Sequence, residues 1–146
     1  MKALHAANRI RTHTTSKEEL DALRALVERD LTDADVPNLS ADRRFATAYN
    51  AVLQLCKMAL ACAGYRVATG LGHHQTTFEA AGLALDPAAS SYTAHFDTCR
   101  RKRNILDYDA ACVATETETK ELLKKAHEFN ELVEGWIAHN HPYLKA

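Results

Sequence analysis

The chain has 146 residues, of which 47% are hydrophobic and 25% charged, and its formal net charge is −1 at pH 7. A chain of this length forms one domain with a real core, and its balanced charge excludes a protein whose whole surface binds polyanions. Any phosphate recognition must therefore be local. With 5 Gly, 3 Pro, 7% aromatic residues and abundant alanine, the composition indicates an all-helical chain and excludes an all-β or parallel α/β fold.

Residues 1–15 mix basic and small residues and lack the continuous apolar run of a secretory signal. No later stretch reaches the ~18 consecutive apolar residues of a membrane span, because Lys57 and Arg66 interrupt the most apolar segment. We therefore expect a cytoplasmic protein with no membrane contact. Residues 1–15 are predicted to be a flexible arm, and residues 16–144 a single domain.

Two helices are predicted in the first half of the chain. Ser16 and Glu19 form a capping-box pattern ahead of apolar residues at helical spacing, which predicts a helix over residues 17–31. Ser40 is a good N-cap for a second helix, which Gly64 ends. This second helix is predicted to be amphipathic and central, because ten of its side chains lie within an arc of about 160°. These ten are Phe45, Ala48, Tyr49, Val52, Leu53, Leu55, Cys56, Ala59, Leu60 and Ala63.

Two more helices follow a loop over residues 65–72. A helical pattern resumes over residues 73–83, and Pro87 marks the first turn of a further helix that runs to about residue 106.

Residues 110–114 lack periodicity and are predicted to be a linker. Thr115 and Glu118 then form a second capping box, which opens a last helix that ends before Pro142. The prediction is an antiparallel up-and-down bundle of four to five helices with short connections.

One cation interrupts the apolar face of the fourth predicted helix. Arg103 lies two turns after Phe96 on the same side, and a guanidinium directed at a core or an interface costs several kcal/mol unless it is paired. Asp107, four residues on, could form a structural ion pair with it. Alternatively, the planar guanidinium could bind a phosphate in a groove. Both interpretations stay open.

Arg103 ends a run of four consecutive cations, residues 100–103. Four neighbours on a helix spread over all of its faces, so that Arg100 and Lys102 flank Arg103 whereas Arg101 points into solvent. A favourable interaction with the helix dipole explains Arg101 but does not explain Arg103.

The glycines at 70 and 72 precede His73 and His74 at the start of a predicted helix. A structural turn is the preferred interpretation, with anion binding by the exposed N–H groups of the helix start as the alternative. The segment has neither a preceding predicted strand nor the lysine of a phosphate-binding loop.

No metal site or cofactor is predicted. His139 and His141 have no Cys or carboxylate partner at a suitable spacing. Tyr49 is expected to pack in the core, as aromatic residues at helical spacing usually do. The cysteines lack zinc-site spacing and are expected to be reduced and mostly buried; they are Cys56, Cys62, Cys99 and Cys112.

Residues 100–109 (RRKRNILDYD), followed by a Glu-rich amphipathic helix ending in Trp136, resemble the C-terminal half of a HEPN domain. Four upstream segments are similar to a bacterial branch of that family: residues 39–45, 48–51, 63–66 and 72–74. The resemblance covers about residues 16–144, and its most specific pieces are Arg-Asn at 103–104, Gly-Tyr-Arg at 64–66 and Gly-His-His at 72–74.

The resemblance implies a helical bundle that forms a homodimer, in which the Arg-Asn segments of two subunits face a shared cleft. The family includes metal-independent ribonucleases of toxin–antitoxin and defence systems, partners of minimal nucleotidyltransferases, and members without known catalysis. The ribonucleases have a His four to six residues after the Arg. Here Arg103 and Asn104 match, but positions 108 to 110 are Tyr, Asp and Ala.

This departure has a chemical consequence. Metal-free RNA cleavage needs a group that moves a proton near neutral pH, and His suits that role. Asp107 is a poor acid at pH 7, and Tyr108 is a poor base. His73 or His74 could enter the cleft from the preceding loop and replace the absent histidine.

Three functions stay open. The preferred one is a dimer that binds a nucleotide or RNA phosphate on Arg103, assisted by Asn104 and Arg100, without the usual ribonuclease activity. The second is an active ribonuclease toxin that uses His73 or His74. The third is a non-enzymatic adaptor for a nucleotidyltransferase or antitoxin partner, with Tyr108 as an acceptor for modification.

Overall fold

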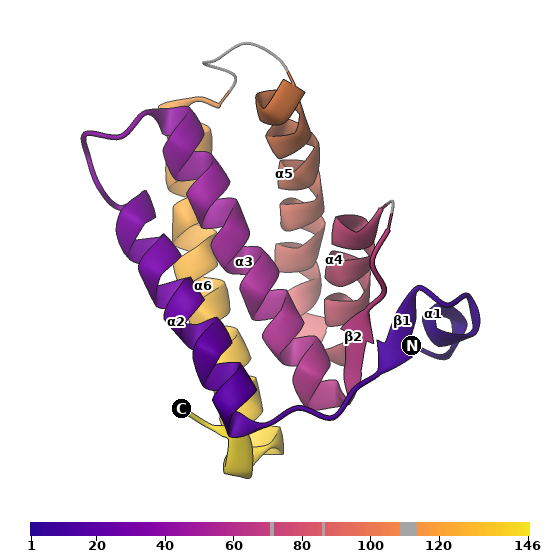
Figure 1. Ribbon diagram of the computed structural model, residues 1–146. Helices are drawn as coiled ribbons and strands as arrows, with labels where there is room; N and C mark the ends of the chain where they lie inside the picture. The colour runs from indigo at the N-terminus through magenta and orange to yellow at the C-terminus, as the bar shows by residue number, and fades with distance from the viewer. Residues whose placement is uncertain (71, 86, 109–113) are drawn as a thin grey trace.

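The computed structural model describes residues 1–70, 72–85, 87–108 and 114–146, with only the backbone of residues 105–108. It is an all-α bundle with one small antiparallel sheet, which confirms the predicted fold class (Figure 1). The bundle helices are α2 (Lys17–Ala34), α3 (Ala41–Ala63), α4 (His73–Ala84), α5 (Ser90–Tyr108) and α6 (Glu116–Asn140). The smaller elements are α1 (Lys2–Ala6), β1 (Ile10–Thr12), β2 (Tyr65–Val67) and the 3₁₀ turns η1 (Pro87–Ala89) and η2 (Pro142–Leu144).

The helices begin and end where their capping residues indicate. The Ser16 hydroxyl accepts a hydrogen bond from the backbone N–H of Glu19, and Thr115 forms both halves of its capping box with Glu118. Gly64 ends α3 in the left-handed conformation, at φ +96°. The main differences from prediction are that α2 runs on to Ala34, and that a 3₁₀ turn precedes α5.

Helix α3 lies at the centre of the bundle. It packs against α2 and α6 on one side and against α4 and α5 on the other (Figure 1). The core is built around aromatic rings from four helices, with the rings of Phe96 and Phe129 5.0 Å apart in an edge-to-face arrangement. Thirteen residues of α3 are buried, so this helix is apolar around more of its circumference than the predicted single face.

The N-terminal segment and the loop after α3 contain structure that the sequence analysis did not predict. The predicted flexible arm, residues 1–15, contains α1 and β1, and β1 pairs with β2 inside the predicted loop. Ile10 faces Val67 across this ribbon and is buried with Leu4 and Leu60. Each strand is three residues long, which is too short for a period-2 pattern to be recognised in the sequence.

The cysteines are predicted to be reduced and mostly buried. Among the described residues, Cys56, Cys62 and Cys99 are indeed buried and form no disulfide. The predicted linker and Cys112 fall on residues 110–114, of which only Ala114 is described. No described helix is both long enough and apolar enough to cross a membrane.

A substitution at Ile10 tests whether the ribbon of β1 and β2 contributes to the stability of the fold. We expect Ile10→Ala to lower the free energy of unfolding by about 2 kcal/mol or more, because it leaves a cavity beside Leu60. Thr14→Ala, at an exposed position of the same segment, is the matched control and should change stability little. Urea unfolding followed by circular dichroism measures both, and equal stability of the two variants would contradict the buried ribbon.

Candidate functional site

Arg103 lies over an aromatic ring of the central helix. Its guanidinium carbon is 5.8 Å from the centroid of the Tyr49 ring, and its side chain is partly buried. A cation over a π face is attracted by the negative potential of that face, which helps the apolar stripe of α5 to accommodate the charge. The alternative partner that the sequence suggested, Asp107, has a side chain outside the described residues.

Tyr49 connects the core to this site. Its ring is fully buried, as predicted, and packs edge-to-face on Phe78 at 5.8 Å. A buried phenol needs a hydrogen-bond partner, and the Tyr49 hydroxyl lies 3.1 Å from Nδ1 of His74 on α4. Tyr49 therefore orients the imidazole of His74 on one side and supports Arg103 on the other.

The position of His74 changes its protonation. Burial is the main cause that lowers its pKa to about 4, and the positive charges of its neighbours lower it further. These neighbours are His73, Arg103, Lys57 and Arg100. Burial likewise raises the pKa of Tyr49, although Arg103 and Arg100 oppose that effect. At neutral pH, both the imidazole and the phenol are uncharged among surrounding cations.

The glycine segment places His73 beside His74. The two imidazole rings are 4.3 Å apart, and Nδ1 of His73 donates a hydrogen bond to the carbonyl oxygen of Gly70 at 2.9 Å. Gly70 and Gly72 both have positive φ, at +137° and +77°, which agrees with the predicted structural turn. Nδ1 of His73 is therefore engaged within the protein, and the residue itself is exposed.

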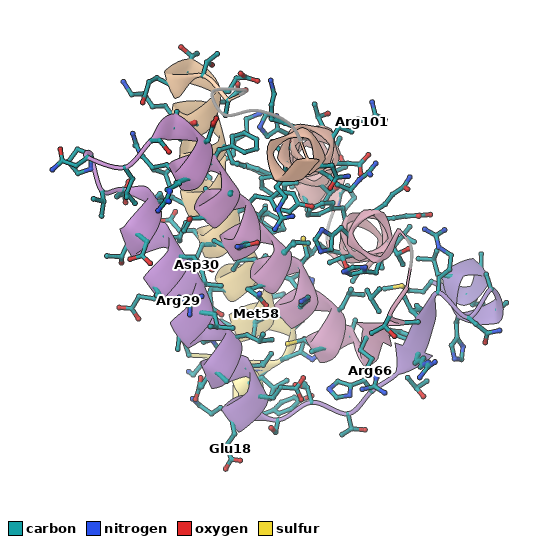
Figure 2. All side chains as sticks on the ribbon, turned by 45° about the horizontal axis from the view of Figure 1, so that its top comes forward. Glu18, Arg29, Asp30, Met58, Arg66 and Arg101 are labelled. Carbon is teal, nitrogen blue, oxygen red and sulfur yellow. The ribbon has the colours of Figure 1, made fainter. Side chains whose placement is uncertain are left out.

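The other three cations of the run on α5 have different surroundings. Arg100 is held by Asp97 one turn earlier, with Nε and Oδ1 2.8 Å apart. Lys102 pairs with Glu118 of α6 at 2.9 Å, so it faces away from Arg100. Arg101 points outward, as predicted (Figure 2). The structure thus brings Arg100, but not Lys102, to the Arg103 side of the helix.

The remaining predicted site residues are less well placed. Asn104 is exposed at the end of the described part of α5, and the side chains of Asp107 and Tyr108 lie outside the described residues. Sequence reasoning missed Lys57, whose charge acts on His74 from α3. It also missed the bond between Tyr49 and His74. No sequence signal identifies either contact, because the partners come from different helices.

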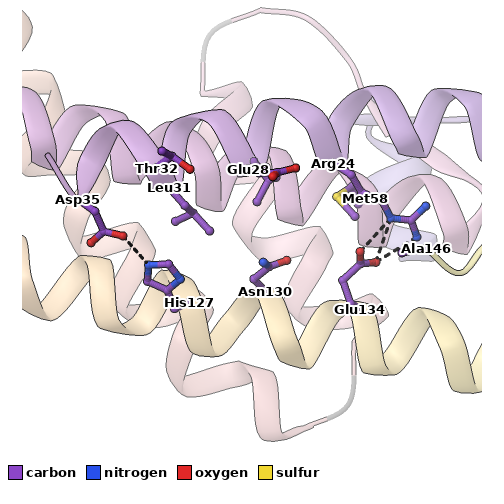
Figure 3. Close-up of a pocket in the computed structure, with 11 residues that line it drawn as sticks. Arg24, Glu28, Leu31, Thr32, Asp35, Met58, His127, Asn130, Glu134 and Ala146 are labelled. Atoms are coloured by element: carbon purple, nitrogen blue, oxygen red, sulfur yellow. Dashed lines mark hydrogen bonds and ion pairs between the residues drawn. The ribbon is translucent and has the colours of Figure 1, made fainter.

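A cavity of about 480 Å³ lies between α2 and α6 (Figure 3). Its two basic side chains already face carboxylates: Arg24 donates to Glu134 and to the carbonyl oxygen of Leu144, and His127 lies 3.4 Å from Asp35. Glu28 adds a further negative charge. This cavity therefore suits an anion less well than the Arg103 site does.

Within the described ranges, no three His, Cys, Asp or Glu side chains lie close enough together to hold a metal ion. His139 is exposed, whereas the ring of His141 packs 5.2 Å from Trp136.

His74 makes stability depend on pH. Its pKa is about 4 in the folded chain and 6.5 ordinarily, so the unfolded chain binds more protons between these values. The unfolding free energy should therefore fall as pH drops from 6.5 to 4, by about 1 kcal/mol because the ring is partly exposed to solvent.

Urea unfolding at several pH values measures this dependence. His74→Gln should lose it, and His139→Gln, at an exposed position, should keep it. An identical pH dependence in wild type and His74→Gln would contradict the assignment.

Comparison of the chain with models of protein families, with curated proteins and with solved structures finds no match. The resemblance to HEPN domains therefore stays a prediction, and a functional conclusion depends on the arrangement of Arg103, Tyr49 and His74.

Proposed function

We propose that this chain is a HEPN-like homodimeric helical-bundle protein that binds a nucleotide or an RNA phosphate at Arg103, without the usual ribonuclease activity. The observation that carries the proposal is the convergence of cations around the buried Tyr49. Arg103 lies over its ring, and His74, bonded to its hydroxyl, has a pKa lowered to about 4 by burial and by surrounding positive charge.

A phosphate suits this environment for two reasons. Arg103 presents a planar set of donors, whose geometry matches the oxygens of a phosphate. Positive charges from residues of three different helices act on His74, so they form a local cluster on a chain of net charge −1. A bound anion would lower the electrostatic energy of the cluster.

The same geometry argues against acid–base catalysis by His74. An imidazole with a pKa near 4 is a weak base at pH 7, and its Nδ1 is already engaged by the Tyr49 hydroxyl. His73 is exposed and keeps Nε2 accessible, which is the observation that favours the alternative of a ribonuclease toxin. The third alternative, an adaptor for a nucleotidyltransferase or antitoxin, requires no anion site.

The homodimer is part of the proposal because the resemblance places two Arg-Asn segments in one cleft. Asn104 is exposed next to the partly buried Arg103, so it is accessible to a second subunit or to a ligand. A doubled cationic cleft would bind a polyanion more tightly than a single one.

Binding of a short single-stranded RNA tests the proposal. We expect Arg103→Gln to weaken binding by about 10- to 100-fold, because it removes a charged hydrogen-bond donor to phosphate. Arg101→Gln is the matched control, since it removes the same charge from the neighbouring, solvent-facing position. Titrations at two salt concentrations, with the oligomeric state defined by sedimentation, should show weaker binding at higher salt. RNA affinity that is independent of both Arg103 and salt would favour the adaptor.

Expression in bacteria separates binding from cleavage. We expect wild-type protein to leave growth and total RNA intact, because His74 is a weak base at cellular pH. Growth arrest with RNA cleavage in wild type, lost in both Arg103→Gln and His73→Gln but kept in Arg101→Gln, would instead establish the ribonuclease.

A further inference from the structure

Another cavity is bordered by His73 and by the strand β2. It has a volume of about 330 Å³ and is enclosed by α2, α3, the strand β2 and the start of α4. Leu23, Leu60 and Val67 form an apolar part of its wall. Lys57, Arg66 and His73 line it as well, so basic and apolar groups face the same space.

The charges of this cavity are not balanced by the protein. Within the described part of the chain, neither Lys57 nor Arg66 forms an ion pair with a carboxylate. The one carboxylate in the wall is Glu19, and both of its oxygens are already within hydrogen-bond distance of His13 Nε2, at 2.8 and 2.9 Å. An excess of positive charge therefore remains beside the apolar wall.

The ribbon adds a second, independent observation. Arg11 of β1 is the direct partner of Arg66 of β2 in the antiparallel register, so the two side chains lie on the same face, and both are exposed. Like charges directly opposite each other destabilise a strand pair. Two arginines on one face of the ribbon suit a ligand group that carries two negative charges.

We propose that this cavity binds a small organic phosphate. The phosphate dianion is bound by Lys57 and Arg66, with Arg11 beside them. The apolar part of the ligand packs on Leu23, Leu60 and Val67. The volume lies within the range of small-molecule sites, and the mixed wall favours a phosphate monoester with an aromatic or aliphatic group over an inorganic ion.

This site differs from the one at Arg103, although His73 and Lys57 contribute to both. The phosphate ligands here come from α3 and the ribbon, whereas Arg103 and Arg100 belong to α5. Substitution of Arg66 therefore acts on this cavity alone, and substitution of Arg103 acts on the other site alone.

Phenyl phosphate and inorganic phosphate are suitable probes, and methyl NMR spectra of Leu23, Leu60 and Val67 report on the cavity. We expect phenyl phosphate to shift these methyl resonances saturably and to bind at least fivefold more tightly than inorganic phosphate. Lys57→Gln with Arg66→Gln should weaken phenyl phosphate at least tenfold. Lys120→Gln with Lys124→Gln, at exposed positions of α6, is the control for equal loss of charge and should leave binding unchanged.

Two further variants make the result decisive. Arg103→Gln should change the phenyl phosphate affinity less than twofold, and Arg11→Gln should raise Tm without ligand, because it relieves the repulsion across the ribbon. The proposal is overturned if the Lys57 and Arg66 double variant, folded by circular dichroism, binds phenyl phosphate as wild type does. It is equally overturned if only Arg103→Gln abolishes binding, since one site would then account for both ligands.

Discussion

Helix α3 buries residues around most of its circumference, and this burial places every other helix of the bundle. Helices α2 and α6 cover one side of it and α4 and α5 the other, while the ribbon of β1 and β2 packs near its C-terminal end. A long helix with alanine and cysteine between its large side chains allows four neighbours to approach closely. The positions of α4 and α5 relative to each other follow from this shared contact.

Tyr49 belongs both to the core and to the candidate site. Burying Tyr49 in α3 removes a phenol from water, and its hydroxyl must find a partner inside the protein. His74 supplies that partner, and the Arg103 guanidinium lies over the face of the same ring. Burial that stabilises the fold also lowers the pKa of the His74 imidazole. The site is therefore positively charged, but its imidazole is a weak base.

Charge is distributed unequally over the chain, although its net charge is only −1. Around the α2–α6 cavity each cation faces a carboxylate, as Arg24 does with Glu134. Around α3, α4 and the ribbon, Lys57 and Arg66 have no such partner within the described residues. The two faces thus differ in electrostatic potential, and a local excess of positive charge attracts anions regardless of the net value.

The sequence by itself determined the helices, because caps and apolar periodicity are local: Ser16, Ser40, Gly64 and Thr115 mark their ends where the structure has them. It also identified Arg103 as a cation on an apolar stripe. Only the tertiary structure decided what Arg103 faces, because the Tyr49 ring and His74 come from other helices. The ribbon was missed for a related reason: strands of three residues carry no periodic signal, and their pairing joins segments more than fifty residues apart.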